Sequence, residues 1–397
     1  MRGSGLTTRR VALVALLGAA VVGCSSSKPI QFDTETSGPS TTTSATVSSS
    51  PLSTDVTGST SATTGALAVG AKWTPAAANL TGLPSECGNM ALVSARPDRD
   101  MLIASVALQG LWSSENGATT WTALGSGAGS AKVTNRGSSI VYDPDRLNTF
   151  WESGTYNGGA VYRTDDNGAS FRQLGFISHA DAVSVDLTDP ARRTLLTNRH
   201  ETSNLYRSTD GGTMWSDISA SLPSNVGFTT GPYVINAQTH LLGTNNGAKS
   251  GVYRTTDGGS TWTNVYDHAV VGTPLLAHSG GALYWVLGTG GIIQSTDGGA
   301  TWKQVTRDGT LSNSASNLVE LPNGNLAAVG NQVVIVSADH GATWRSVGPG
   351  MPYAPSGLTY SAFRNAFYIW HFDCDFSTNN PIPANAILSL SYDYKTQ

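Results

Sequence analysis

One short phrase recurs along the chain and limits what the chain can fold into. Three copies read STDGGATW, TTDGGSTW and SADHGATW, at Ser295–Trp302, Thr255–Trp262 and Ser337–Trp344. Three more are TDDNGASF at Thr164–Phe171, STDGGTMW at Ser208–Trp215, and SSENGATTW at Ser113–Trp121, which has Glu for Asp and one extra residue. Their acidic residues are Glu115, Asp166, Asp210, Asp257, Asp297 and Asp339, at spacings of 51, 44, 47, 40 and 42. A period of about 40–50 residues is typical of a four-stranded propeller blade.

The sequences around each copy are rich in β-forming residues. Short apolar runs such as GVYR and QVVIV precede the phrase, and two more such runs lie further upstream, as in SSIVYDP and then NTFWESG. Pro and Asp mark the turn between those two runs. This pattern predicts that each unit has the order strand, turn, strand, loop, strand, box, strand. No segment after the N-terminal apolar stretch has helical periodicity.

The repeated residues suit a tight turn better than a reaction. An Asp can accept backbone N–H groups within its own turn, and Gly adopts backbone conformations that other residues oppose. The Trp has the size to fill the space between neighbouring sheets. A catalytic residue would not need to be repeated in six units, so we interpret all six acidic residues as structural.

The six phrases closely resemble the Asp-box, or BNR repeat, written Ser/Thr-x-Asp-x-Gly-x-Thr-Trp/Phe. That motif is shared by sialidases, two-propeller xyloglucan-active glycosidases, sortilin-type receptors and photosystem assembly factors. The resemblance covers the chain from about Ala66 onward. It implies an all-β propeller in which each box is the hairpin between the third and fourth strands of a blade.

The two ends of the repeat region predict how the ring closes. After the sixth box come three further strand-like runs, SGLTYSAF, NAFYIWHF and AILSLSYDYKTQ, and the last contains half a box at Ser391–Asp393. The segment GAKWT at Gly70–Thr74 resembles the missing half. We therefore predict a seven-bladed propeller whose last sheet is completed by a strand around Lys72–Pro75. Six blades with irregular ends are the alternative.

The first 23 residues have the pattern of a signal peptide. Arg2, Arg9 and Arg10 precede the apolar run VALVALLGAAVV, which is too short to span a bilayer. The ending VVGC resembles a bacterial lipobox and implies acylation, by chains such as palmitate, on Cys24. An ordinary secretory signal is the alternative. The lipoprotein interpretation predicts a cell-membrane protein anchored on the extracytoplasmic face.

Residues 24–66 are expected to form a tether. After Cys24 they are mostly Ser, Thr, Gly and Pro, with almost no apolar surface to offset the entropy of ordering, so we expect disorder. The propeller is assigned to residues 67–397. Without the three signal arginines, 20 basic side chains face 27 acidic ones, which argues against a nucleic-acid partner. The expected partners are the lipid bilayer, through Cys24, and a glycan, peptide or envelope protein; we expect a monomer without a cofactor.

The Asp-box resemblance also implies where a ligand would bind. In such propellers the box hairpins share one face with the turns between first and second strands, and ligands usually bind on the opposite face. The residues predicted on that binding face are Tyr156, His179, Asp181, Arg199, His200, His268, Arg307, Tyr353 and His371. Its histidines could hold a metal or line a polar, solvated funnel. Because none of them has metal-motif spacing, no metal site is predicted.

Two functions remain open from the sequence. The first is a non-catalytic binding or assembly module. The second is a glycoside hydrolase, for which Glu201 and Asp373 are the preferred carboxylates and Glu152 the third choice. A sialidase is a weak match, because SARPDRD at Ser94–Asp100 lacks the Ile of the Arg-Ile-Pro signature.

Two cysteines remain after Cys24. Outside the cytoplasm a pair of cysteines is more often bridged than free. In a closed seven-bladed ring, Cys87 and Cys374 fall in neighbouring blades on the face opposite the boxes. We predict a Cys87–Cys374 disulfide at the seam, with two separate thiols as the alternative.

Overall fold

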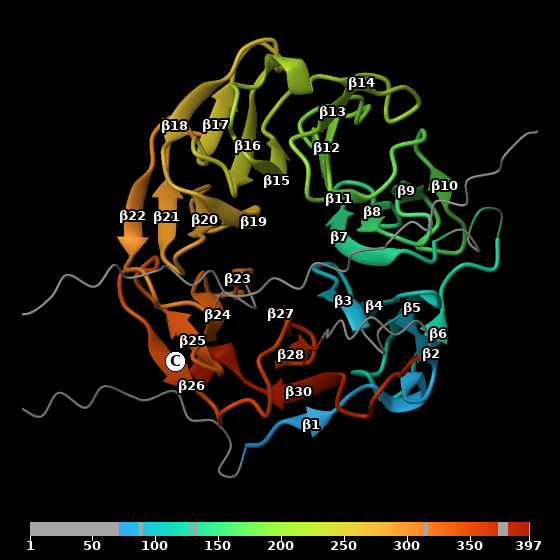
Figure 1. Cartoon of the computed structure of the whole chain (residues 1–397). Helices are drawn as coiled ribbons and strands as arrows, with labels where there is room; N and C mark the ends of the chain where they lie inside the picture. The colour runs from blue at the N-terminus through green and yellow to red at the C-terminus, as the bar shows by residue number, and fades with distance from the viewer. Residues whose placement is uncertain are drawn as a thin grey trace, which may run out of the picture. The chain divides into compact units, whose positions relative to one another are not determined.

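Residues 71–86, 90–127, 129, 133–312, 317–371 and 380–396 are described by a computed structural model of the chain. Their strands form seven four-stranded antiparallel sheets arranged as the blades of a propeller (Figure 1). The predicted seven-bladed fold is confirmed, and the six-bladed alternative is wrong. The signal peptide, Cys24 and the tether lie outside the described residues.

The blades follow one another along the chain. Blade 1 contains β3 (Met90–Ala95), β4 (Leu102–Val106), β5 (Gly110–Ser114) and β6 (Thr122–Ala123). Blade 2 contains β7 (Arg136–Tyr142), β8 (Phe150–Thr155), β9 (Val161–Thr164) and β10 (Arg172–Gln173). Blade 3 contains β11 (Ala180–Val185), β12 (Leu195–Arg199), β13 (Leu205–Ser208) and β14 (Ser216–Asp217). Blade 4 contains β15 (Phe228–Val234), β16 (His240–Asn245), β17 (Val252–Thr255) and β18 (Thr263–Tyr266).

The remaining blades lead back to the start of the described chain. Blade 5 contains β19 (Val270–Leu276), β20 (Leu283–Leu287), β21 (Ile292–Ser295) and β22 (Lys303–Thr306). Blade 6 contains β23 (Val319–Glu320), β24 (Leu326–Gly330), β25 (Val333–Ser337) and β26 (Arg345–Val347). Blade 7 contains β27 (Gly357–Ser361), β28 (Ala366–Trp370), β30 (Ile387–Ser391) and β1 (Thr74–Pro75). Short 3-10 helices lie at Ala78–Leu80 (η1), Ser219–Ser221 (η4) and Tyr394–Thr396 (η5). None of the helices in the described ranges has the length and hydropathy needed to cross a bilayer.

The ring closes through the N-terminal strand, as predicted. β1 pairs antiparallel with β30, with Thr74 opposite Ser389. A second short pair joins the same two ends of the chain, because β2 (Pro84–Ser85) lies beside β29 (Asn380–Pro381). Cys87 and Cys374 lie outside the described residues, so their disulfide stays a prediction.

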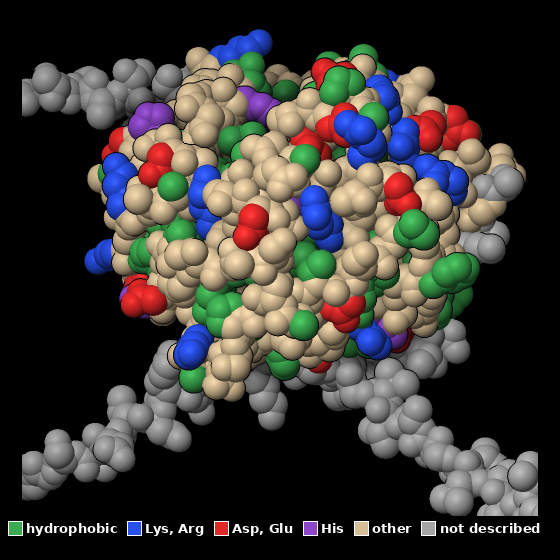
Figure 2. Space-filling view, turned by 90° about the horizontal axis from the view of Figure 1, so that it is seen from above, with side chains coloured by type: hydrophobic (Ala, Val, Ile, Leu, Met, Phe, Trp, Pro, Cys, Tyr) green, Lys and Arg blue, Asp and Glu red, His purple; other side chains and the backbone are tan. Residues whose placement is uncertain are grey.

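The core consists of apolar layers between neighbouring blades. The second strands β4, β20, β24 and β28 are buried at every position. Each such strand has a neighbouring blade on both faces, so it takes a continuous apolar run instead of an alternating one. Val329 of blade 6, for example, shares a cluster with Leu358 and Ile369 of blade 7. On the side of the molecule seen in Figure 2, acidic and basic side chains lie interspersed.

The box hairpins satisfy their own hydrogen bonds. The Asp297 carboxylate accepts bonds from the Ser295 hydroxyl at 2.8 Å, the Thr301 amide at 2.9 Å and the Thr301 hydroxyl at 2.6 Å. The Gly299 amide donates to the Ser295 hydroxyl at 2.9 Å. Asp166, Asp257 and Asp339 accept the same set of bonds. Asp210, whose turn has Met where the others have Ser or Thr, accepts the Ser208 hydroxyl and backbone amides but lacks the second hydroxyl donor.

The first box differs from its sequence interpretation. Asn116, not Glu115, occupies the acidic position, because its side-chain oxygen accepts the Ser114 hydroxyl at 2.9 Å and the Thr120 amide at 3.0 Å. Its NH2 group then donates to the Thr120 hydroxyl at 2.8 Å. The box therefore starts at Ser114 and has no extra residue, and the structural role predicted for Glu115 is wrong. Ala118 stands at the usual Gly position with a φ of 69°.

Candidate functional site

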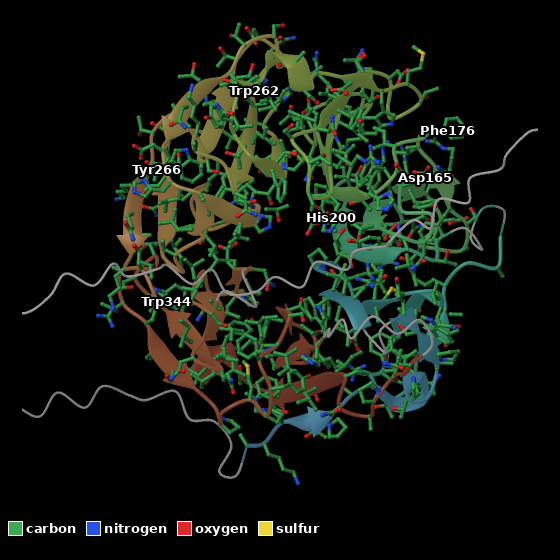
Figure 3. All side chains as sticks on the ribbon, in the orientation of Figure 1. Asp165, Phe176, His200, Trp262, Tyr266 and Trp344 are labelled. Carbon is green, nitrogen blue, oxygen red and sulfur yellow. The ribbon has the colours of Figure 1, made fainter. Side chains whose placement is uncertain are left out.

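Charged and aromatic side chains gather where blades 1, 2 and 3 meet on the face opposite the boxes. We call this group the loop-face cluster; it consists of Glu86, Arg136, Tyr156, His179, Asp181, His200 and Glu201. Each member follows a second strand or lies in or next to a connection into a blade, which is why the fold brings them to one face. Figure 3 places His200 toward the centre of the ring, with Asp165 and Phe176 near its outer edge.

Tyr156 lies at the centre of the loop-face cluster. Its ring packs edge-on against His179 and His200, at centroid distances of 5.3 and 5.5 Å. The Arg136 guanidinium lies 4.8 Å from the same ring centroid, within cation–π range. The phenol ring is therefore held between two imidazoles and a cation, with its surface half-buried.

The charges of the loop-face cluster are paired with one another. Glu86 accepts a 2.9 Å bond from Arg136 and a second bond from the Asn157 amide group. His200 Nδ1 lies 2.9 Å from Asp181, and His200 Nε2 lies 3.8 Å from Glu201. Glu201 is the most exposed of these carboxylates, because 37% of its side chain is accessible.

The backbone of this region is strained. Tyr156, Asn157, His179 and Glu201 have φ values of 52°, 45°, 57° and 50°, in the left-handed region that favours Gly. Such conformations cost on the order of 1 kcal/mol each and persist where surrounding contacts enforce them. The His179 amide donates to the Gly159 carbonyl at 3.0 Å, and the His200 amide to the His179 carbonyl at 2.9 Å. Neighbouring loops thus hold each other in place.

The two imidazoles have opposite pKa shifts. Burial lowers the pKa of His200, but the hydrogen bond to Asp181 and the charges of Asp181 and Glu201 outweigh it, so the net pKa is raised above 6.5. Burial also lowers the pKa of His179, and the charges of Arg199 and His200 lower it further. His200 is therefore the imidazole that protonates first as pH falls.

Glu152 does not join this group at the surface. Its side chain is wholly buried between blades 1 and 2, where Asn135 donates a 3.3 Å bond to it. Burial raises the pKa of Glu152 to about 8. A substrate in solvent cannot touch this carboxyl group, so its predicted catalytic role has no support in its position.

The other predicted residues form separate small groups. His268 lies 2.8 Å from Asp267, and the His371 ring lies 4.8 Å from the Tyr353 ring. Arg307 is exposed, and Asp373 lies outside the described residues. Within the described part of the chain, no group of three or more His, Cys, Asp or Glu side chains has an arrangement that could hold a metal ion.

Two members of the cluster were missed in the sequence. Glu86 lies in the connection into blade 1, and Arg136 is the first residue of β7. Their pairing joins positions 50 residues apart. One signal could have found them. Both lie in or next to a connection into a blade, and such connections were predicted to lie on the binding face.

The comparisons with known proteins support the fold. No protein-family model and no curated protein matches the chain. A GH74 enzyme from Niastella koreensis has a similar structure, with 16% identity and a TM-score of 0.52 over 78% of this chain and 55% of that one. YCF48 bound to D1 peptide is 15% identical, with a TM-score of 0.51 over 81% of this chain and 96% of YCF48. The extracellular domain of the putative one component system BT4673 from B. thetaiotaomicron is 12% identical, with a TM-score of 0.53 over 81% and 40%. The chain thus spans about half of the GH74 structure.

Proposed function

We propose that this protein is a lipid-anchored binding module of the bacterial cell envelope, whose ligand contacts the loop-face cluster. The observation that carries the proposal is the mutual pairing of charges around Tyr156. Such pairing holds an aromatic ring and an exposed carboxylate in fixed positions, as a recognition surface requires. Glycans, peptides and envelope proteins all offer hydroxyl or N–H groups that Glu201 and Asn157 could bind.

The pairing favours binding over hydrolysis. A glycoside hydrolase needs two carboxyl groups about 5–10 Å apart on either side of the scissile bond. In the described cluster, Glu86 is bonded to Arg136 and Asp181 to His200. Glu152 is buried, so within the described part of the cluster Glu201, 3.8 Å from His200, is the carboxylate most open to a ligand.

The proteins of similar fold also favour binding over hydrolysis. The chain covers 96% of YCF48, whose structure holds a peptide, but 55% of the GH74 enzyme. We therefore infer a display role, with acylated Cys24 as anchor and the Ser/Thr-rich segment as spacer.

The test uses the full chain in detergent on arrays of immobilised glycans and of peptides, together with chromogenic aryl glycosides. We expect binding to an array member without release of the chromophore. Tyr156→Ala should weaken that binding at least tenfold, while Tyr266→Ala, a half-buried Tyr at the end of β18, should not. Turnover that is lost in a Glu201→Gln, Asp373→Asn double variant would instead establish the hydrolase.

A further inference from the structure

The outer edge of blade 2 contains an unusual pair of like charges. Arg163 of β9 and Arg172 of β10 are directly opposite each other in the antiparallel register. Like charges in that position repel and destabilise the strand pair. The corresponding pairs in the other boxed blades are Ser113–Thr122, Arg207–Ser216, Arg254–Thr263, Gln294–Lys303 and Val336–Arg345. Only blade 2 places two cations together at this position.

These two arginines are also bonded differently from their counterparts. Arg207 and Arg254 donate to backbone carbonyls of the next blade, at Ala237 and Gly298. Arg163 instead donates two bonds to Asp165, at 2.9 and 2.6 Å. Arg172 is exposed and has no hydrogen bond or ion pair from its side chain to any described residue. Asp165 therefore pairs with one of the two guanidinium groups, and Asp166, the other carboxylate of the groove wall, bonds within its own turn. Among the described residues, the Arg172 guanidinium is left without a carboxylate partner.

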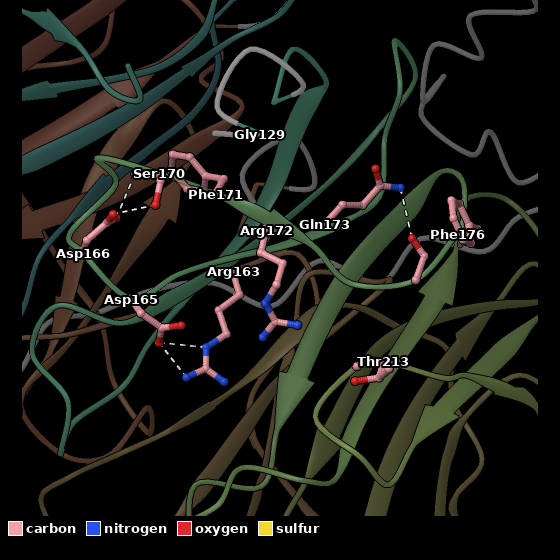
Figure 4. Close-up of a pocket in the computed structure, with 12 residues that line it drawn as sticks. Gly129, Arg163, Asp165, Asp166, Ser170, Phe171, Arg172, Gln173, Phe176 and Thr213 are labelled. Carbon is pink, nitrogen blue, oxygen red and sulfur yellow. Dashed lines mark hydrogen bonds and ion pairs between the residues drawn. The ribbon is translucent and has the colours of Figure 1, made fainter. Parts of the chain in front are cut away.

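Both guanidinium groups point into a groove between blades 2 and 3, and Figure 4 shows them side by side. The groove has a volume of about 650 Å³, and its wall includes Gln173, Phe176 and the Thr213 hydroxyl. It lies at the outer edge of the ring, away from His200 (Figure 3). It is therefore a site separate from the loop-face cluster.

The groove also offers apolar contact. Phe176 is 97% exposed, in the connection from blade 2 to blade 3. Met214, next in the chain to Thr213, is 73% exposed. Arg, Phe and Met are enriched at protein–protein interfaces and Lys is depleted there. Among the described residues, the groove wall has two Arg and no Lys, which favours a protein partner over a polyanion held by charge alone.

We propose that this groove, the rim site, binds an acidic segment of a partner protein. A carboxylate of the segment accepts two parallel N–H bonds from Arg172, the bidentate geometry that a guanidinium group favours, with Arg163 beside it as a second positive charge. A neighbouring apolar side chain of the segment packs on Phe176. The incoming carboxylate also relieves the repulsion between the two arginines, which explains how blade 2 can keep both.

The test selects peptides from a random phage-displayed library on the immobilised full chain. We expect the selected sequences to be rich in Asp and Glu and to contain an apolar residue. Synthetic copies should bind Arg172→Ser at least tenfold more weakly than the unmodified protein. Lys303→Ser is the matched control, because it removes one cation at the same position of blade 5 and should leave binding unchanged.

Three outcomes would overturn the proposal. The selected peptides could lack acidic residues, they could bind Arg172→Ser as well as the unmodified protein, or an immobilised sulfated polysaccharide could be retained through Arg172 with no acidic peptide selected. A Phe176→Ser variant separates the two halves of the site, since it should weaken peptides with an apolar residue more than their Ala-substituted copies. Binding at the loop-face cluster is measured with Tyr156→Ala, so either proposal can fail alone.

Discussion

The two faces of the propeller are built on different rules. On the box face one hairpin is repeated, and its Ser or Thr, Asp or Asn and Gly or Ala bond within the turn. On the opposite face, blade 5 joins β20 to β21 through Gly288–Gly291, a tight turn closed by a bond between Leu287 and Gly291. Blades 2 and 3 have instead strained loops with unrepeated charges. The comparison teaches that repetition marks the parts that hold the ring together, and departures from it mark candidate sites of function.

On the box face, the largest loss of stability should come from removing a buried ion pair between two blades. Arg192 is wholly buried and donates to both oxygens of the buried Asp143, at 2.9 and 2.7 Å. Arg192→Leu leaves that carboxylate buried without its cation and should lower the free energy of unfolding by about 3–5 kcal/mol. Urea denaturation measures the change.

The neighbouring residue supplies the control. Arg193, whose side chain is 67% exposed, pairs with Asp189 on the surface. Arg193→Leu should leave the unfolding midpoint unchanged, because exposed ion pairs contribute little. Equal effects of the two substitutions would contradict the role given to burial.

The next largest effect on stability is expected from the predicted disulfide between the first and last blades. If Cys87 and Cys374 are bridged, reduction or a double Cys→Ser variant should cost about 2–4 kcal/mol, since the bridge would close a long loop of the unfolded chain. Non-reducing mass spectrometry of the purified full chain measures the two-hydrogen mass loss on the linked peptides. Two thiols that both react with an alkylating agent in the unfolded, unreduced protein would remove the bridge.

Much of the box face could be predicted from sequence, because its bonds are local. The position of β1 beside β30 follows from two halves of one box at opposite ends of the chain. The Glu115 assignment failed for a local reason as well, since Asn can replace Asp as the acceptor when a Thr hydroxyl lies opposite.

The loop face could be predicted only in part, because its contacts join different blades. Tyr156, His179 and His200 were expected on that face, but their packing depends on three connections at once. Glu86 and Arg136 pair across blades, and no local pattern encodes such a contact. Glu152 was expected among the loops, yet strand alternation in β8 directs it into the blade interface.

The buried carboxyl group of Glu152 makes the stability of the fold depend on pH. At its register position opposite the third strand, the other blades carry Ala104, Thr197, Leu242, Trp285, Ala328 and Tyr368, so blade 2 alone has a carboxyl group there. Because burial raises the pKa of Glu152 to about 8, its contribution to stability is full below 4.5 and is lost as pH rises through about 8.

Glu152→Gln removes that dependence. Relative to the unmodified protein, we expect the variant to gain roughly 3–4 kcal/mol in unfolding free energy between pH 5 and pH 9. Urea denaturation at pH 5, 7 and 9 measures the gain. Parallel pH profiles for the two proteins would show that Glu152 is ionised in the folded state.

The smallest effect tests a single repeat of the box face. Asp297 is exposed, although the Gly299 amide and the Ser295 hydroxyl beside it are buried. Its loss should cost the hydrogen bonds of an exposed turn and remove the acceptor of the buried Ser295 hydroxyl, about 1–2 kcal/mol for Asp297→Ala. Asp297→Asn should cost less, because Asn116 already holds the same turn in blade 1 with one oxygen and a reversed bond to Thr120. Midpoints of thermal unfolding rank the unmodified protein and the two variants.

Any ligand bound at the loop-face cluster should stay bound to both variants. A variant that keeps its stability but loses that ligand would falsify the structural role of the box.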